Sequence, residues 1–182
     1  MDLLGVDDVR RIIVFTLWNM PLWTIKMNVD VTAGYRMMWP NKNPPDTLFM
    51  DKNLESARPP DIFACWEHMP FRDDVFETVF FDPPHKIGRT TGRGFWATPS
   101  HKNYYGIDIS HTKFRTGVYK GTREFLRVAK RLCFKWNDIE LTPFRVMSLF
   151  PKEWKQINHH VINKGLKTKT LTHWITFVRC LG

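Results

Sequence analysis

Four short apolar runs follow one another in the first half of the chain, and three of them end at an aspartate. The runs are 24–31, 47–50, 61–65 and 76–81, and the aspartates are Asp30, Asp51 and Asp82. Runs of this length, rich in β-branched and aromatic residues and separated by turn-forming residues, are typical of strands. In open α/β sheets ligands bind outside the carboxyl ends of the strands, so these three acids indicate a common cleft.

The remaining pattern alternates helices with strands. Apolar residues at helical spacing predict a helix over 117–132 that leads into a short strand over 133–136, and a second helix over 142–150 that Pro151 ends. Two strand-like runs, 156–162 and 171–179, lie on either side of Gly165 and predict a closing hairpin. An apolar stretch within residues 1–23 predicts an N-terminal helical segment that covers the sheet.

The composition favours one soluble domain. A chain of 182 residues is expected to form a single domain over 1–182, and it contains no run of 18 apolar residues and no secretory leader pattern. We therefore expect a cytoplasmic protein without membrane contact. The three cysteines are far apart, and neither they nor His159 and His160 have a metal-ligand spacing, so we expect no metal site and no disulfide.

The tetrapeptide Asp82-Pro83-Pro84-His85 follows the fourth apolar run. Proline fixes its own φ and pushes the residue before it toward extended geometry, so two prolines stiffen the backbone where the strand ends. The Asp82 carboxylate and the Pro83 carbonyl then present two acceptors at a fixed separation. Two such acceptors can hold an exocyclic amino group in line with an electrophilic methyl group, which indicates amine methylation. The alternative is a turn that merely closes the strand.

A basic and aromatic segment follows this motif. The formal net charge is +9, with 27 Lys and Arg against 18 Asp and Glu. Cations and rings alternate over a substrate loop assigned to 82–116: Lys86, Arg89, Arg93, Phe95, Trp96, Lys102, Tyr104, Tyr105, Lys113 and Arg115. Phosphate-neutralising cations beside stacking rings are typical of surfaces for unstacked nucleic acid, so these residues are candidate substrate contacts. The alternative is a solvated loop with a few buried aromatics.

A small-residue turn follows the first strand. Asp30, Thr32, Ala33 and Gly34 lie in this turn, and Asp51 comes 21 positions after Asp30. A turn of this kind with an acid about 20 residues later suits an adenosine-type cofactor, whose ribose hydroxyls the acid binds. The prolines at 40, 44 and 45 exclude a pyrophosphate-binding helix there, which favours S-adenosylmethionine, a cofactor without phosphates. The alternative for Asp51 is a solvated acid at a strand end.

With these motifs the chain resembles the class I S-adenosylmethionine-dependent methyltransferases, and among them the small phage- and plasmid-type methyltransferases with an Asp-Pro-Pro-His motif. The resemblance runs from Asp30 to Arg179 and rests on 30–34, 36–39, Asp51, 69–71, 76–85, 134–137 and 172–174. It implies a Rossmann-like α/β fold, with a seven-stranded, mostly parallel sheet whose last strand is antiparallel and helices on both faces.

The resemblance also implies roles for single residues. In nucleic-acid amino-methyltransferases the first residue of the motif and the first proline carbonyl hold the target amine, and an aromatic fourth residue stacks on the flipped base. His85 stands at that fourth position here. Cys65, followed by Trp66, stands where many class I enzymes place the acid that contacts the adenine of the cofactor. Asn137 is a candidate cleft residue. Phe134 and Trp136 beside it, and His173-Trp174 in the last strand, are expected to be core residues.

These observations predict an S-adenosylmethionine-dependent methyltransferase of DNA or RNA, acting on an exocyclic base nitrogen as in N6-adenine methylation. Two alternatives stay open at this point: methylation of a protein or small molecule, and a catalytically silent nucleic-acid-binding module. A homodimer or a separate recognition protein also stays open.

Overall fold

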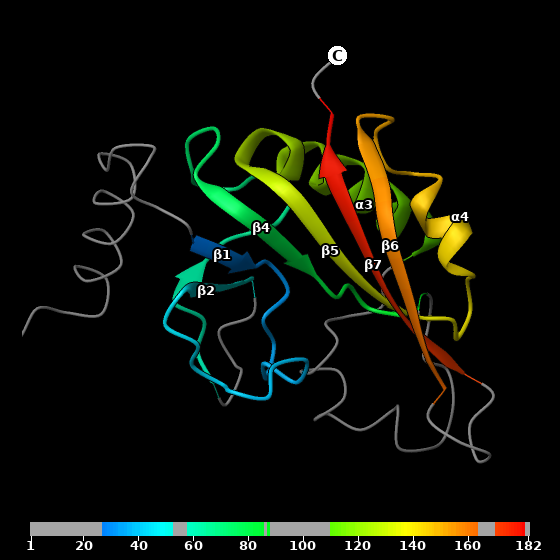
Figure 1. Cartoon of the computed structure of the whole chain (residues 1–182), viewed down its shortest axis with the longest axis horizontal. Helices are drawn as coiled ribbons and strands as arrows, with labels where there is room; N and C mark the ends of the chain where they lie inside the picture. The colour runs from blue at the N-terminus through cyan, green and yellow to red at the C-terminus, as the bar shows by residue number, and fades with distance from the viewer. Residues whose placement is uncertain (1–26, 53–57, 86, 88–109, 164–169, 181–182) are drawn as a thin grey trace, which may run out of the picture.

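The computed structural model describes residues 27–52, 58–85, 87, 110–163 and 170–180. These residues form one seven-stranded sheet in the order β3-β2-β1-β4-β5-β7-β6 (Figure 1). The strands are β1 Met27–Asp30, β2 Thr47–Asp51, β3 Ile62–Phe63, β4 Phe76–Phe81, β5 Ala129–Asn137, β6 Trp154–Asn163 and β7 Leu171–Arg179. The first five pair in parallel, and β7 is antiparallel to both β5 and β6. The predicted Rossmann-like sheet with an antiparallel last strand is confirmed.

Two helices are described, α3 His111–Val128 and α4 Pro143–Met147. The Ser110 side chain caps α3 by accepting a hydrogen bond from the backbone N–H of Lys113 at 3.2 Å. The predicted helix over 117–132 was displaced: α3 starts at His111, and residues 129–132 already belong to β5. The reason is that Leu132 and its neighbours pair with β4 and keep the two-residue alternation of a strand. Neither described helix is long and apolar enough to cross a membrane.

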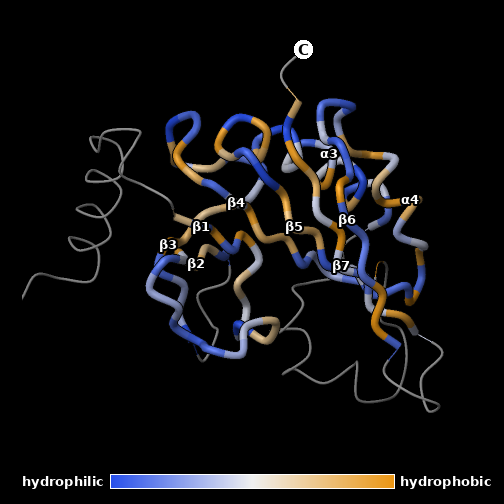
Figure 2. Tube along the Cα trace, in the orientation of Figure 1, coloured by the Kyte–Doolittle hydropathy of each residue, from blue (hydrophilic) through white to orange (hydrophobic). Residues whose placement is uncertain are grey.

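The core lies between the sheet and α3. Alternate side chains of β4 and β5 point to this face, and they are fully buried: Val79, Phe81, Leu132, Phe134 and Trp136. Phe125 of α3 packs edge-on against Phe81 with ring centroids 5.0 Å apart. Figure 2 shows hydrophobic positions gathered in the middle of the sheet. The expectation that Phe134 and Trp136 are core residues is confirmed.

The opposite face of the sheet is covered differently in the described residues. Trp39, from the segment after β1, packs on Phe49 of β2 and Phe80 of β4 with centroid distances of 5.7 and 4.7 Å. The helical segment predicted within 1–23 lies outside the described residues, and so does the predicted helical cover of this face. Residues 111–116, predicted as the end of the substrate loop, belong to α3, and residues 86 and 88–109 of that predicted loop lie outside the described residues.

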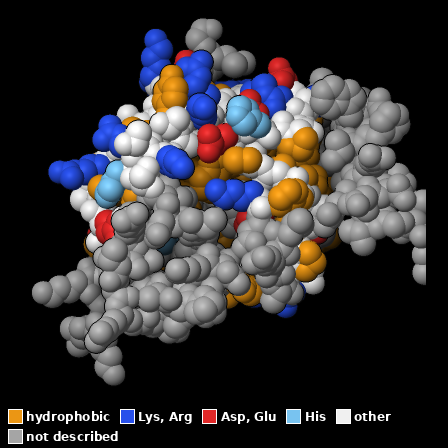
Figure 3. Space-filling model, turned by 180° about the vertical axis from the view of Figure 1, so that it is seen from behind, with side chains coloured by type: hydrophobic (Ala, Val, Ile, Leu, Met, Phe, Trp, Pro, Cys, Tyr) orange, Lys and Arg blue, Asp and Glu red, His pale blue; other side chains and the backbone are white. Residues whose placement is uncertain are grey.

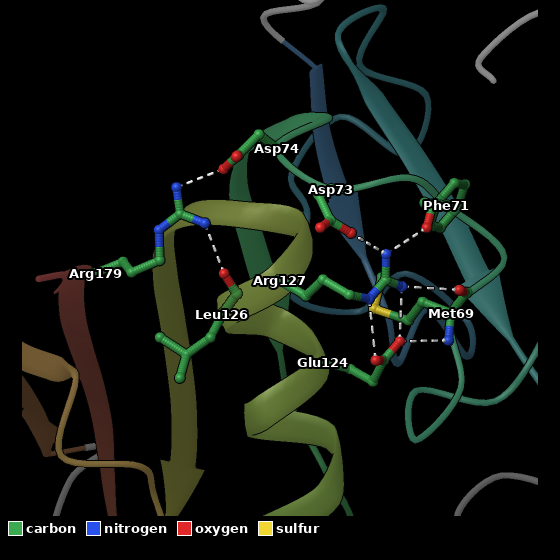
Figure 4. Close-up of polar contacts among 8 residues, drawn as sticks. All are labelled: Met69, Phe71, Asp73, Asp74, Glu124, Leu126, Arg127 and Arg179. Carbon is green, nitrogen blue, oxygen red and sulfur yellow. Dashed lines mark hydrogen bonds and ion pairs between the residues drawn. The ribbon is translucent and has the colours of Figure 1, made fainter. Parts of the chain in front are cut away.

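One guanidinium ties the segment before β4 to α3 (Figure 4). Arg127 donates to the carbonyl oxygens of Phe71 at 2.6 Å and Met69 at 3.2 Å, and it forms ion pairs with Asp73 and Glu124 at 2.9 Å. Glu124 in turn accepts the backbone N–H of Met69 at 3.0 Å. Arg127 therefore fixes a segment without regular structure onto the end of the helix.

A second guanidinium closes the same edge of the sheet. Arg179, the last residue of β7, pairs with Asp74 and donates to the carbonyl oxygen of Leu126 at 2.7 Å. Both guanidinium groups lie near the beginning of β4 and β5 (Figure 4). The three strand-ending acids lie at the opposite ends of the strands. The amino edge of the sheet is thus held by ion pairs, which leaves the carboxyl edge for other chemistry.

We predict that Arg127→Met lowers the free energy of unfolding by about 2 kcal/mol, because it leaves two carbonyl oxygens and two carboxylates without their donor while the site stays exposed enough for water to replace part of the loss. Chemical denaturation measures this change. The matched control is Lys130→Met, which removes an exposed cation 3.4 Å from Glu77 and should cost less than about 1 kcal/mol. Equal losses in the two variants would contradict the assigned role.

Candidate functional site

The turn after β1 is fixed by a buried carboxylate. Asp30 is 1% exposed, and its Oδ1 accepts the backbone N–H of Thr32 at 2.9 Å, which closes an Asx turn. Its Oδ2 accepts the indole N–H of Trp39 at 2.8 Å. The backbone N–H of Ala33 donates to the carbonyl of Met50 on β2 at 3.1 Å. Asp30 therefore shapes the turn and attaches it to Trp39.

Gly34 and Asp51 meet at the carboxyl ends of β1 and β2. Gly34 has φ +46°, a left-handed conformation that favours glycine, and its backbone N–H donates to Asp51 Oδ2 at 2.8 Å. The two residues predicted as a cofactor pair are thus in direct contact. Asp51 is partly exposed, so its carboxylate lies at the surface beside the backbone of the turn at Gly34.

Thr32 links this turn to the Asp-Pro-Pro-His motif. Its hydroxyl oxygen accepts the backbone N–H of Asp82 at 2.8 Å and lies 3.4 Å from Asp30 Oδ1, to which it donates. Since β1 lies between β2 and β4 in the sheet, all three acids are adjacent at one edge. The three strand-ending acids therefore lie at one edge of the sheet, as predicted.

Asp82 is held on both carboxylate oxygens. Its Oδ1 lies 2.9 Å from Nε2 of His85, and its Oδ2 pairs with the ammonium of Lys135 on β5. Burial acts to raise the pKa of Asp82, but the hydrogen bond from His85 and the positive charge of Lys135 outweigh it and hold the pKa below its usual value. The motif therefore presents an ionised carboxylate, which accepts hydrogen bonds and does not donate them.

His85 points inward. It is 6% exposed, and its ring meets Trp136 edge-on with centroids 4.9 Å apart. Nδ1 accepts the backbone N–H of Asn137 at 3.4 Å, which leaves Nε2 to carry the proton directed at Asp82. The Asn137 side chain accepts from the hydroxyl of Thr172 at 2.6 Å. His85 thus supports Asp82, while Asn137 joins β5 to β7.

Asp30 differs from Asp82 in its charge. Burial, helped by the neighbouring charges of Asp82 and Asp51, raises the pKa of Asp30 to about 7, although the hydrogen bonds from Trp39 and Thr32 act in the opposite direction. The edge of the sheet therefore carries fewer than three full negative charges near neutral pH.

The other predicted site residues fall into two groups. Trp66 packs edge-on against Phe81 with centroids 5.0 Å apart and lies against Gly121 of α3, where an added Cβ would stand 3.0 Å from the ring. Cys65 is partly buried beside it. Outside the described residues lie Lys86, Arg89, Arg93, Phe95, Trp96, Lys102 and Tyr104.

Sequence reasoning missed two residues of this edge. Lys135 lies in a strand where only its neighbours at 134 and 136 were interpreted. It points to the face opposite those two, and a lysine in a central strand is itself a signal of a charged partner. Arg36 is 7% exposed, and its guanidinium lies 3.8 Å above the ring of Phe49 and bonds to Asn43 Oδ1 at 2.6 Å and Asp61 Oδ1 at 3.3 Å. Arg36 therefore organises the segment between β1 and β2. Among the described residues, no group of three or more metal-ligating side chains occurs.

Comparisons with known proteins add the following. No family model and no curated protein sequence matches the chain. Its fold resembles the E. cuniculi Mtq2–Trm112 complex, described as responsible for methylation of the eRF1 translation termination factor, with a TM-score of 0.53, 12% identity, and coverage of 90% of this chain and 99% of that chain.

Two other solved structures align less closely. TrmN from Thermus thermophilus has a TM-score of 0.46 at 12% identity, and the alignment covers 85% of this chain and 44% of that chain. The hMettl16 catalytic domain, in complex with MAT2A 3'UTR hairpin 6, has a TM-score of 0.47 at 14% identity, with 97% and 72% covered. The strand order and the likeness to the Mtq2–Trm112 complex establish a Rossmann-like α/β fold with an antiparallel last strand.

We predict that Asp30 makes the protein less stable as pH rises from about 4 to 7. The folded pKa is raised above the unfolded value of 3.8, so in this window the folded state holds a proton that the unfolded state has lost. Asp30→Asn removes this term. The stability of the variant relative to the parent should therefore grow by up to about 1.4 kcal/mol per pH unit across the window, as measured by denaturation. Parallel pH profiles would rule out a buried, proton-holding Asp30.

Proposed function

We propose that this protein is an S-adenosylmethionine-dependent methyltransferase that acts on an exocyclic amino group of a nucleobase. The observation that carries the proposal is the edge at which β2, β1 and β4 end in adjacent acids, with Asp82 held ionised at the start of the Asp-Pro-Pro-His segment. The same tetrapeptide is the basis of the resemblance to small phage- and plasmid-type methyltransferases.

The cofactor would occupy the carboxyl ends of β1 and β2. Asp51 is the residue to accept the ribose hydroxyls, and Gly34 brings the backbone close to the ligand. Cys65 and Trp66 remain candidates for the adenine end. When bound, S-adenosylmethionine supplies an electrophilic methyl group. The residues present fit such a ligand, because a carboxylate and a tight turn meet there and a phosphate-binding helix is absent from the described segment between β1 and β2.

Asp82 and the Pro83 carbonyl would orient the target amine. An amino group on an aromatic base is a poor nucleophile, and two acceptors on its hydrogens polarise the N–H bonds and shift electron density toward nitrogen. Holding that nitrogen in line with the methyl group reduces the entropy lost on reaching the transition state. The nitrogen gains the methyl group and loses one proton, and the cofactor leaves as the thioether.

The nucleic-acid strand would approach along the basic segment. Two cations of this segment, Lys113 and Arg115, are described, and both are exposed on the first turns of α3. Phe114 between them packs against Trp136 with ring centroids 5.8 Å apart. Trp136 also contacts His85, so the first turn of α3 lies near the Asp-Pro-Pro-His segment. Figure 3 shows Lys and Arg side chains spread over the described part of the α3 face. Cations in this position suit phosphates flanking a flipped base.

Methylation of a protein is the second candidate, because the Mtq2–Trm112 complex is described as acting on a protein factor. A small-molecule substrate would use the same cleft, and a silent nucleic-acid-binding module would bind no cofactor. Transfer of a radiolabelled methyl group to DNA, to RNA, to a protein extract and to a metabolite pool distinguishes these possibilities. Label in nucleic acid alone supports the proposal, whereas label confined to protein or metabolites contradicts it.

Asp51→Ala should weaken binding of S-adenosylhomocysteine at least about tenfold, because it removes charge-assisted hydrogen bonds worth about 1.5–3 kcal/mol each. Calorimetric titration measures the affinity. Asp46→Ala is the matched control, since Asp46 stands at the other end of β2 and bonds to Asn28. Equal affinity in the Asp51 variant and the parent would reject the ribose assignment.

Asp82→Ala should reduce the rate of methyl transfer about 10²–10³-fold, the usual loss for one well-placed polar contact in a transition state. Cofactor affinity should stay near that of the parent. Asp82→Asn keeps one acceptor oxygen and should retain part of the rate. Single-turnover methyl transfer to whichever nucleic acid is labelled most strongly measures the rates of both variants. A full rate in Asp82→Ala would show that the Asp-Pro-Pro-His motif is a turn that closes the strand and has no part in catalysis.

A further inference from the structure

Lys135 reaches Asp82 from a different part of the sheet. The register of β4 and β5 pairs Phe81 with Phe134, which puts position 135 beside position 82. The Lys135 side chain is 14% exposed, and its ammonium lies 6.0 Å from the ring of Trp174 on β7. Burying a cation in a central strand is costly unless it is paired, so the position of Lys135 depends on its ion pair with Asp82.

The pair has a specific geometry. His85 Nε2 occupies Oδ1 of Asp82 and the Lys135 ammonium occupies Oδ2. Oδ1 is buried from solvent, so Oδ2, which keeps a lone pair beside the ammonium, is the atom that a substrate can reach. With both oxygens paired, the carboxylate has little freedom to rotate, and the remaining lone pair of Oδ2 points in a fixed direction.

We propose that Lys135 is a positioning residue for the methyl transfer: it keeps Asp82 ionised and the free lone pair of Oδ2 aimed at the target amine. This inference rests on the proposed function. The ammonium also makes Asp82 a weak base, so Asp82 orients the amine without taking its proton. As the N–C bond forms and the S–C bond breaks, the sulfonium becomes a thioether and the nitrogen releases one proton to water.

Among the described residues, three charged or titratable groups face Asp82. Lys135 approaches from β5 and His85 from the segment after β4, and both favour the ionised carboxylate. Asp30 approaches from β1 and interacts with Asp82 as a like charge. Near neutral pH Asp30 is partly protonated, so it opposes the ionised Asp82 only weakly, and this opposition grows as pH rises.

The first experiment needs no activity. Carbon-13 carboxyl signals of aspartate are titrated in the full chain, and Asp82→Asn assigns the Asp82 signal. The pKa of Asp82 should lie below its usual value in the parent, rise clearly in Lys135→Met, and stay low in Lys135→Arg, which keeps the cation. Lys130→Met, an exposed lysine of the same strand, is the matched control and should leave the titration unchanged. An Asp82 titration equal in Lys135→Met and the parent overturns the proposal.

The second experiment tests the link to the reaction. Lys135→Met should lower kcat about 10²-fold with KM for the cofactor unchanged, and its kcat should fall on the acid side where Asp82 takes up a proton. Lys135→Arg should recover most of the rate, and Lys130→Met should match the parent. A purely structural lysine would leave the pH profile unmoved, which overturns the proposal. If Lys135→Met does not fold, Lys135→Gln replaces it in both experiments.

The two experiments distinguish failure of the proposed function from failure of the role assigned to Lys135. Parent protein that methylates no nucleic acid, with the Asp82 titration shifted as expected, rejects the proposed function and leaves only the ion pair. Active parent protein with an unshifted titration rejects Lys135 alone.

Discussion

Packing three carboxylates at one edge of a sheet is the constraint on which the rest of the site depends. The parallel pairing of β1 with β2 and β4 forces Asp30, Asp51 and Asp82 together, and like charges in a poorly solvated place repel. Each acid is compensated differently. Asp30 holds a proton up to a pH of about 7, Asp51 accepts the N–H of Gly34, and Asp82 is paired with Lys135 and supported by His85. The chemical roles proposed for the acids follow from these differences.

The two edges of the sheet have different roles: ion pairs stabilise the amino edge, and the candidate site lies at the carboxyl edge. At the amino edge, Arg127 and Arg179 donate to backbone carbonyls and pair with carboxylates, which stabilises the fold. At the carboxyl edge, hydrogen bonds connect the turn after β1 to the segment after β4 through Thr32, and Oδ2 of Asp82 keeps an acceptor position. A ligand bound across this edge would contact elements that Thr32 already connects.

Much of the fold could be predicted from the sequence, because apolar alternation and strand-ending acids are local signals. The strands 47–51 and 76–81 and the closing hairpin were located closely. The end of α3 was misplaced because Val128, Ala129 and Leu132 satisfy both helical and strand spacing, and only pairing with β4 decides between them. The pairing of Lys135 with Asp82 could not be predicted, since it depends on register between residues 53 positions apart. The same limit applies to His85, whose burial against Trp136 is a tertiary contact.

The central claim is that the carboxyl edge of β2, β1 and β4 is a cofactor cleft that delivers a methyl group to an amine held at Asp82. A crystal structure with S-adenosylhomocysteine bound tests it most directly. The account predicts the ribose hydroxyls on the Asp51 carboxylate and the sulfur atom facing Asp82, with the Lys135 ion pair intact. A ligand seated elsewhere, or a sulfur atom turned away from Asp82, would contradict it.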